Sequence, residues 1–517
     1  MALSEGQNAA SEPAMMSLPL IRDLVFVGGG HTHALVLRRW AMKPLAGVRV
    51  TLITPGPTAA YSGMLPGHVA GHYDRDTLNI DLVRLARAAG ARLVLDKAFG
   101  LDPAAKLVHL ETGDPVGYDL CSIDVGIHTP LPDVPGFDEH GHPAKPLDAF
   151  ADAWERFASG GGPGRVVVIG AGVAGVELAM AAAHRLRGAG RSAQVTLVDK
   201  GPALAALGNA ARRTLRNALT KAEITLYENM GVAAIRARAV VLEDGREIAS
   251  DFTLGAGGPR PHGWLRNTGL DLHRGYIAVD AQLRSLTDPS VYAVGDCAHL
   301  SHAPRPKAGV FAVREAPTLY TNLRADLTGS QRSLYRPQKD YLKLISMGGK
   351  QAIAEKNGFT LSGAWMWRWK DRIDRKFMDQ FRELTPMAPP EPPSDAVRGL
   401  RAAMGAKPHC GGCGAKVGRG ALRAALAHAP APARKDVIAL PGDDAAVLRL
   451  GAVDQVISTD HLRAFCEDPV LMARVSLNHA MGDVWAMGAV PQAALAHVTL
   501  PRLSPELQDR TLRAVMA

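Results

Sequence analysis

A glycine-rich loop in the last quarter of the chain places a cysteine close to a lysine. In KPHCGGCGAKVG, residues 407–418, Cys413 lies three positions before Lys416. A nearby ammonium group lowers the pKa of a thiol and leaves a thiolate at neutral pH, so this spacing predicts a reactive cysteine. A zinc site would need two ligands besides Cys410 and Cys413, and no second pair of normal spacing follows them. The pattern therefore favours a thiolate over a structural metal.

Carboxylates beyond this loop have the arrangement of a magnesium and nucleotide site. They stand in a glycine turn, after a strand or in a predicted helix, at Asp443, Asp444, Asp460 and Asp483. Oxygen ligands without a Cys/His spacing pattern suit the hard Mg²⁺ ion and the phosphates of its nucleotides. The C-terminal region is therefore predicted to bind a metal and a nucleotide.

A complete dinucleotide-binding turn lies in the first half of the chain. RVVVIGAGVAGVELAMAAA has the order strand, turn and helix, with Gly170, Gly172 and Gly175 in the G-x-G-x-x-G positions. The next strand ends in Asp199. An acid there accepts hydrogen bonds from a ribose 2′-hydroxyl and repels a 2′-phosphate, so NADH is favoured over NADPH.

A second turn, nearer the N-terminus, is irregular. In DLVFVGGGHTHALVLRRW, Gly28 and Gly30 fill two glycine positions, but His33 stands at the third, and the next strand ends in Thr54 rather than an acid. Glycines there let the backbone approach a pyrophosphate at the helix N-terminus. By itself this turn fits dinucleotide binding and a merely glycine-rich turn equally well.

The composition is that of a globular protein with several domains. The 517 residues exceed one ordinary core, and 47% hydrophobic with 21% charged residues exclude a disordered chain. The strand, turn and helix units predict an α/β fold, and five prolines in TPMAPPEPPSD, residues 385–395, predict an extended linker. The net charge of +9 is spread along the chain without a basic block among aromatics, so no nucleic-acid partner is expected.

The cysteines and the hydrophobic runs bear on location. The five cysteines are too few and too scattered for a disulfide framework, which favours the cytoplasm: Cys121, Cys297, Cys410, Cys413 and Cys466. Residues 1–19 lack a basic start and an apolar run, so we expect a tail rather than a signal peptide. The longest apolar run, from Val166, contains Glu177 and the glycine turn, so we expect a buried strand and helix and no transmembrane span.

A third element completes a recognisable set. SVYAVGDCAHL is a short strand that ends in Gly295 and Asp296. Two glycine turns followed by V-G-D resemble the FAD-dependent pyridine nucleotide oxidoreductases over about residues 21–385. The resemblance implies that the first unit holds FAD, that the second, inserted unit holds NAD(P)H, and that Asp296 bonds the ribityl chain of FAD. It also places Lys307 in the segment against the flavin.

The cysteine positions restrict the chemistry of this half. Residues 21–120 and the second glycine-turn unit contain no cysteine, which excludes a dithiol relay there. Cys121 and Cys297 are expected to be packing residues rather than a redox couple. Hydride should therefore pass from NADH to flavin and on to another acceptor, as in type II NADH dehydrogenases. Tyr61 and His68, in the turn-rich stretch AAYSGMLPGHVAG, are further candidates for contact with the flavin ring.

A helical stretch before the linker has an apolar stripe. In AWMWRWKDRIDRKFMDQF, large apolar residues recur every four positions: Trp365, Trp369, Ile373, Phe377 and Phe381. Packing of this stripe on the flavin domain is the commoner explanation. Peripheral contact with an anionic membrane is the alternative, because periodicity alone does not separate the two.

The motifs after the linker resemble selenide, water dikinase, of the aminoimidazole-ribotide-synthetase-like superfamily, over about residues 408–517. The resemblance implies an α+β N-terminal lobe in which Cys413 and Lys416 act near the transferred phosphoryl group. It further implies ATP contacts from Lys416, Asp460 and Asn478 and metal ligation by Asp443, Asp444 and Asp483. Because the family continues into a second lobe and this sequence stops at LQDRTLRAVMA, the dikinase is expected to be incomplete as given.

These readings predict an α/β chain with two Rossmann-like units, the second inserted in the first, and a last α+β lobe. The expected segments are a tail (1–20), the first FAD part (21–150), the NAD(P)H unit (151–275), the second FAD part (276–330), a C-terminal region (331–385), a linker (386–407) and the dikinase-like lobe (408–517).

We expect a bifunctional enzyme, an FAD-dependent NAD(P)H oxidoreductase fused to a selenide, water dikinase, that acts with ATP and Mg²⁺ on small molecules and forms a homodimer. The alternatives are an NADH:quinone dehydrogenase with an inactive lobe and a lobe that serves only dimerisation.

Overall fold

The computed structural model describes residues 20–131, 133–384, 419–427, 434–438, 445–462, 464, 468–500 and 503–516. The chain forms two compact units. The larger comprises Leu24–Leu45 and Val50–Pro386, and the smaller comprises Met1–Asp23, Ala46–Arg49 and Met387–Ala517.

The first sheet of the larger unit is assembled from distant parts of the chain. Its order is β20 (Val291–Ala293), β9 (Leu120–Ile123), β1 (Arg22–Val27), β2 (Val48–Thr54) and β5 (Arg92–Leu95). The pairs β20–β9, β9–β1 and β2–β5 are parallel. Strand β9 is buried throughout and β1 from its second residue onward, as expected of strands inside a parallel sheet, and α1 (His31–Met42) packs beside α9 (Gly309–Thr328).

The second sheet lies between β9 and β20 in the sequence, which confirms the inserted arrangement. Its order is β10 (Gly141–Pro143), β17 (Phe252–Gly255), β11 (Gly164–Ile169), β12 (Ala193–Val198) and β13 (Thr225–Tyr227), and all four pairings are parallel. The predicted buried strand and helix from Val166 are β11 and α7 (Val173–Gly188), so the α/β class is confirmed. Helices α6 (Leu147–Ser159) and α8 (Asn209–Lys221) complete this part.

The larger unit also contains several small sheets and short helices. The antiparallel pieces are β3 (Thr58–Ala60) with β4 (Asn79–Asp81), β6 (Ala98–Asp102) with β7 (Leu107–Leu110) and β8 (Val116–Gly117), β14 (Val232–Arg236) with β15 (Ala239–Leu242) and β16 (Glu247–Ala249), and β22 (Lys343–Ser346) with β23 (Ala352–Lys356) and β24 (Phe359–Gly363). A mixed piece holds β18 (Leu272–His273), β19 (Tyr276–Val279) and β21 (Ala298–Leu300). The short helices are α2 (Leu65–Val69), α3 (Arg75–Leu78), α4 (Leu82–Ala88), α5 (Phe137–His140), η1 (Ser62–Met64), η2 (Gly263–Asn267) and η3 (Gly295–Cys297).

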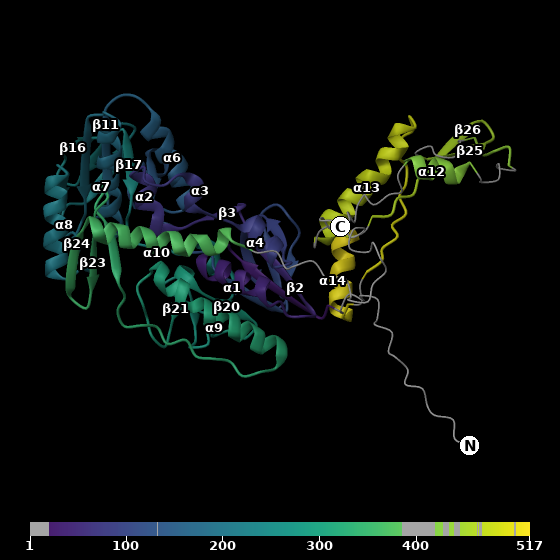
Figure 1. Cartoon of the computed structure of the whole chain (residues 1–517), viewed down its shortest axis with the longest axis horizontal. Coiled ribbons are helices and arrows are strands. Elements are labelled where there is room, and N and C mark those ends of the chain that lie inside the picture. The colour runs from purple at the N-terminus through teal and green to yellow at the C-terminus, as the bar shows by residue number, and fades with distance from the viewer. Residues whose placement is uncertain are drawn as a thin grey trace, which may run out of the picture. The chain divides into compact units, whose positions relative to one another are not determined.

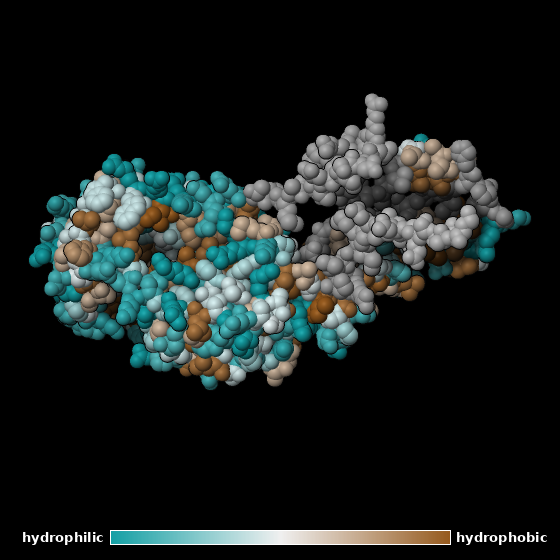
Figure 2. All heavy atoms as spheres, turned by 60° about the horizontal axis from the view of Figure 1, so that its bottom comes forward, coloured by the Kyte–Doolittle hydropathy of each residue, from teal (hydrophilic) through white to brown (hydrophobic). Residues whose placement is uncertain are grey.

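Helix α10 (Ala364–Arg382) is the long green helix that runs across the larger unit in Figure 1. Its burial differs from the expected packing of the apolar stripe. Trp365, Trp369 and Ile373 are 50%, 43% and 40% exposed, so the packing prediction is wrong for these three. Lys370 and Asp374 are buried instead, because each finds a charged or polar partner on that face. Figure 2 shows brown hydrophobic patches among hydrophilic residues on the surface of the larger unit.

The smaller unit has few described elements. They are α12 (Arg419–Leu426), the hairpin of β25 (Ala446–Leu450) and β26 (Val453–Ile457), α13 (Pro469–Ala486) and α14 (Pro505–Met516). Asp468 caps α13 by accepting hydrogen bonds from the amides of Val470 and Leu471, and Pro469 fills the first turn, where no amide donor is needed. Across the described parts of both units, no helix is at once long enough and apolar enough to cross a membrane.

Candidate functional site

The first glycine turn, between β1 and α1, is held against an acid that follows β9. Gly28 has a φ of +93°, which favours glycine, and a Cβ at Gly28 would fall less than 3.0 Å from the carbonyl oxygen of Asp124. A Cβ at Gly30 would fall equally close to the Asp124 carboxylate. Both predicted positions therefore require glycine because a larger side chain would clash with Asp124, another residue of the same protein.

Asp124 occupies the N-terminus of α1. Its Oδ2 accepts hydrogen bonds from the backbone amides of Thr32 (3.0 Å) and His33 (3.1 Å). Complete burial raises the pKa of Asp124 to about 7. Sequence reasoning missed this residue, and the only available signal was a lone acid at the end of a buried strand.

His33 replaces the third glycine of the motif. In the second turn, a Cβ at Gly175 would collide with the carbonyl of Gly170, which is why glycine is needed there. In the first turn, the His33 ring instead bonds that equivalent carbonyl, with Nδ1 2.7 Å from the oxygen of Gly28 and Nε2 2.8 Å from Oγ of Ser122. Burial lowers the pKa of His33 to about 3, so the neutral ring donates from Nδ1 and accepts at Nε2.

The predicted Asp296 lies beside a lysine that sequence reasoning missed. Lys145 Nζ is 3.0 Å from Oδ2 of Asp296. The amide of Gly295 donates to Glu315 of α9, and burial raises the pKa of Glu315 to about 8. The predicted Lys307 donates to the carbonyl of Ala298 and lies over the Tyr276 ring, at 4.2 Å from its centroid.

The first glycine turn and Asp296 fit the FAD that they were predicted to bind. Helix α1 follows a glycine turn and presents its N-terminus, where the pyrophosphate of FAD would bind, and the first amides of the helix are already bonded to Asp124. Asp296 supplies an acceptor for hydroxyl groups. Thr54, the residue in place of the usual acid, bonds the carbonyl of Gly56 at 3.2 Å.

The predicted acid Asp199, which follows β12, lies against the second glycine turn. Asp199 Oδ2 accepts from the amide of Ala171 (2.6 Å), and Oδ1 accepts from the amide of Gly201 (2.8 Å). A Cβ at Gly172 would meet nothing within 4 Å, so the space beside α7 is open. This arrangement fits a dinucleotide whose ribose reaches Asp199.

A buried polar network joins α10 to the first turn. Lys370 Nζ is 2.6 Å from Oδ2 of Asp374 and 2.6 Å from the carbonyl of Gly63. The Tyr61 hydroxyl donates to Asp374 (3.3 Å), its ring stacks on Phe377 and its centroid lies 5.4 Å from that of His31. Burial raises the pKa of Asp374.

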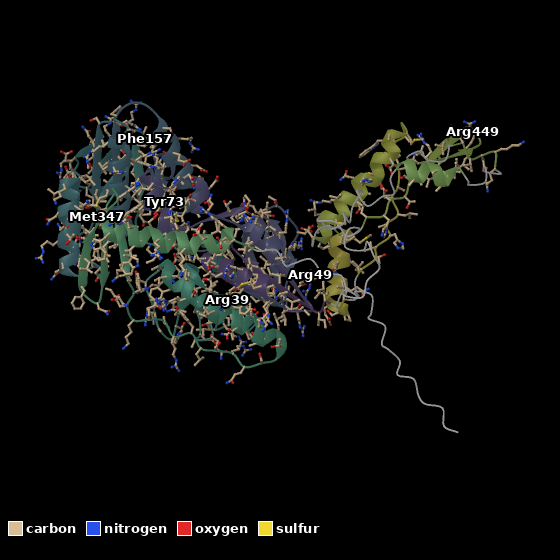
Figure 3. The ribbon with its side chains drawn as sticks, in the orientation of Figure 1. Arg39, Arg49, Tyr73, Phe157, Met347 and Arg449 are labelled. Carbon is tan, nitrogen blue, oxygen red and sulfur yellow. The ribbon has the colours of Figure 1, made fainter. Side chains whose placement is uncertain are left out.

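Two neighbours extend this network. Glu177 of α7 accepts from the amide of Ser346 at 2.7 Å, and burial raises its pKa to about 7. Tyr73, labelled in Figure 3, donates its hydroxyl to Asp371 of α10 at 2.7 Å. Sequence reasoning included Tyr61 and missed the others, although Lys370 and Asp374 are four apart on one helix face.

The remaining candidates of the larger unit are His68, Cys121 and Cys297. His68 lines a cavity of about 340 Å³ together with Tyr73, Arg75, Trp154 and Arg185. Cys121 and Cys297 are buried free thiols, as expected of packing residues. Burial raises the pKa of both, that of Cys297 to about 12.

In the smaller unit, Cys413, Lys416, Asp443 and Asp444 lie outside the described residues. The structure brings Asp460 and Asp483 together with His479, which sequence reasoning missed, and their ligand atoms all lie within 4.8 Å of one another. His479 Nδ1 contacts Asp460, and the hydroxyl of Ser458 donates to Asp483 at 2.8 Å. Asn478 is exposed and donates to the carbonyl of Arg474 in its own helix. Two carboxylates and an imidazole fit a divalent cation.

Comparison with known families decides the class of the larger unit. Residues 22–316, more than half of the chain, match the model of the pyridine nucleotide-disulphide oxidoreductases. The chain belongs to this family. It is therefore an enzyme of the oxidoreductase class, and its family supports binding of FAD and NAD(P)H. Residues 442–517 match the N-terminal domain of AIR synthase related proteins.

Individual relatives match the two parts of the chain separately. The NADH dehydrogenase-like protein YutJ of Bacillus subtilis is 26% identical over 351 residues, which cover 64% of this chain and 91% of the relative. The selenide, water dikinase of Burkholderia orbicola is 37% identical over 97 residues, 18% of this chain. The oxidoreductase spans only 27% of that dikinase's length.

Solved structures show the same fold. A sulfide:quinone oxidoreductase of Aquifex aeolicus gives a TM-score of 0.59 at 18% identity and covers 71% of this chain and 93% of its own. NDH2 of Plasmodium falciparum gives 0.58 at 14% identity, with 70% and 98% covered.

Proposed function

We propose that the chain is an FAD-dependent NADH oxidoreductase joined to a lobe of a selenide, water dikinase. The observation that carries the first half is the pair of glycine turns with Asp296 at one and Asp199 at the other, in a chain of the pyridine nucleotide family. The second half is supported by the match of residues 442–517 and by the cluster of Asp460, His479 and Asp483.

The roles in the flavin half follow from the contacts described above. Gly28, Gly30 and the N-terminus of α1 would hold the pyrophosphate of FAD, and Asp296, fixed by Lys145, would bond the ribityl hydroxyls. Bound FAD would supply a two-electron acceptor for the hydride of NADH. The buried cysteines Cys121 and Cys297 are poor redox partners because their thiols hold their protons, so the electrons leave to an external acceptor.

The buried network of α10 is suited to moving a proton. Asp374 and Glu177 have raised pKa values. Tyr61 donates a hydrogen bond to Asp374, and its ring contacts the ring of His31. We propose that Lys370, Asp374 and Tyr61 exchange a proton with the reacting centre while α10 excludes water from it.

Replacing Asp199 with serine tests the flavin half. Asp199→Ser removes the repulsion of a 2′-phosphate and one charged acceptor, so the preference in kcat/KM for NADH over NADPH should fall by about 10–100-fold. Anaerobic bleaching of the flavin by each nucleotide measures the preference. Asp244→Asn, at an exposed turn of the same unit, should leave it unchanged. An unaltered preference in Asp199→Ser would refute the proposed NADH site.

In the dikinase half we propose that ATP, selenide and water give selenophosphate, AMP and phosphate. Cys413 and Lys416 would act at the transferred phosphoryl group, Lys416, Asp460 and Asn478 would contact ATP, and Asp443, Asp444 and Asp483 would hold Mg²⁺. The flavin half would then pass its electrons to a selenium species and so supply the selenide.

Serine at Cys413 tests the dikinase half. In protein isolated from its own cells, Cys413→Ser should lower selenide-dependent formation of AMP from ATP at least about 100-fold, because a hydroxyl stays protonated where a thiolate forms. Cys410→Ser, in the same loop, is the matched control and should keep the activity. Equal activity of both variants would refute the role of Cys413, and absence of this activity in the wild type would favour a lobe that serves only dimerisation.

The exposed apolar face of α10 supports a second candidate, an NADH:quinone oxidoreductase. Trp365, Trp369 and Ile373 are exposed beside Arg368 and Arg372, an arrangement that suits an anionic membrane surface. Quinone-dependent NADH oxidation that rises on addition of anionic vesicles would favour this candidate over a selenium acceptor.

A further inference from the structure

The two glycine turns of the larger unit differ at one equivalent position. A Cβ at Gly28 would collide with the backbone oxygen of Asp124, and a Cβ at Gly170 would collide with that of Ala256. Asp124 and Ala256 therefore follow corresponding strands, β9 and β17. The first unit carries a carboxylate where the second carries a methyl group.

This carboxylate fills space that is open in the other unit. At Gly172 a Cβ would meet nothing within 4 Å, whereas at Gly30 it would overlap the Asp124 carboxylate. A Cβ at Gly295 would also come within 3.0 Å of Oδ1 of Asp124. Asp124 is thus held between the first glycine turn and the loop that carries Asp296.

The position of Asp124 brings it into conflict with a bound pyrophosphate. Gly30, the N-cap of α1, offers no side chain, and Asp124 instead supplies negative charge to the amides of Thr32 and His33. A helix N-terminus after a glycine turn is also where a dinucleotide pyrophosphate binds. Two anions would then share one helix terminus.

Both acidic and basic groups surround Asp124. The η3 loop brings Asp296 and the thiol Cys297 to Asp124, α9 brings Glu315, and the cations near these groups are Lys307 and Lys145. His31, on α1 itself, is held neutral because burial lowers its pKa to about 4. Burial of Asp124 raises its pKa to about 7, so a modest further negative potential suffices to protonate it.

We propose that Asp124 takes up one proton from solvent when FAD binds, so that the protein holds FAD less tightly as the pH rises. The inference rests on the proposed binding of FAD. Below about pH 7 the carboxyl is already protonated, and binding needs no proton. Above that pH the proton must be taken up, so the dissociation constant of FAD should rise by up to about tenfold per pH unit.

Calorimetry of FAD binding to the apoprotein measures this proton directly. Titrations at pH 6 and pH 8.5, each in two buffers of different ionisation enthalpy, give the number of protons taken up. The wild type should take up close to one proton per FAD at pH 8.5 and close to none at pH 6. Uptake near zero at pH 8.5 would overturn the proposal without any variant.

Variants identify the group. Asp124→Asn keeps an oxygen acceptor for the two amides and should abolish the uptake and flatten the pH dependence of the dissociation constant. Glu315→Gln, the matched buried acid, should retain the uptake. The assignment fails if Asp124→Asn still takes up the proton or if Glu315→Gln alone loses it. Failure of FAD to bind at either pH would instead refute the proposed FAD site itself.

Discussion

Replacing Lys370 with alanine is expected to lower the stability of the larger unit by about 3–5 kcal/mol, which corresponds to a urea midpoint about 1 M lower. The side chains of Lys370 and Asp374 are only 8% and 6% exposed. Loss of the ammonium group leaves Asp374 buried without its charge partner and the carbonyl of Gly63 without its donor. Tryptophan fluorescence during urea denaturation measures the midpoint.

Two further variants separate structure from function at this site. Lys376→Ala, at an exposed position of the same helix, should change stability by less than about 0.5 kcal/mol. Lys370→Met with Asp374→Asn removes both charges, keeps an acceptor for Tyr61 and should recover most of the lost stability. The rate of NADH oxidation by this double variant should remain below that of the wild type, since the proton-exchanging groups are gone. Full recovery of both properties would reduce the pair to a structural role.

Alanine at Gly30 is expected to cost about 2–4 kcal/mol of stability and to impair retention of flavin. Gly30 has a φ of −61°, which alanine adopts without strain, so the whole effect should come from collision of the new methyl group with Asp124. The displaced carboxylate would lose the amides of Thr32 and His33, which are buried. Thermal unfolding and the flavin content of the purified protein measure the two effects.

The collision can be tested by removing the other partner. Gly30→Ala combined with Asp124→Ala should be more stable than Gly30→Ala alone. Gly172→Ala is the matched control in the second turn, where the φ is −69° and a Cβ meets nothing, so little loss of stability is expected. Equal losses at Gly30 and Gly172 would contradict the steric explanation.

Local patterns predicted the parts of the site that depend on local geometry. The spacing of Gly170, Gly172 and Gly175 and the acid at Asp199 describe one strand, turn and helix, and the structure places them together. Asp124 could not be found in this way, because its partners are the amides of Thr32 and His33, 92 and 91 residues away.

Helix α10 and the C-terminal cluster show two other limits. Periodicity marks an apolar stripe but not which face is buried, and here partners for Lys370 and Asp374 outweigh the burial of three large apolar side chains. In α13, neighbouring residues point to different sides, so His479 reaches Asp460 while the predicted Asn478 turns to its own helix.

The pairing of β20 with β9 also sets the order in which this protein can assemble on the ribosome. Strand β9 needs Val291–Ala293 to cover its second edge, and those residues are made after the whole inserted sheet, which ends with β17 at Gly255. At about 5–20 residues per second, the apolar edge of β9 waits roughly ten to thirty seconds for its neighbour. The nascent chain thus carries a finished second sheet together with an open first sheet, and the uncovered edge of β9 is where a chaperone or an aberrant strand would attach.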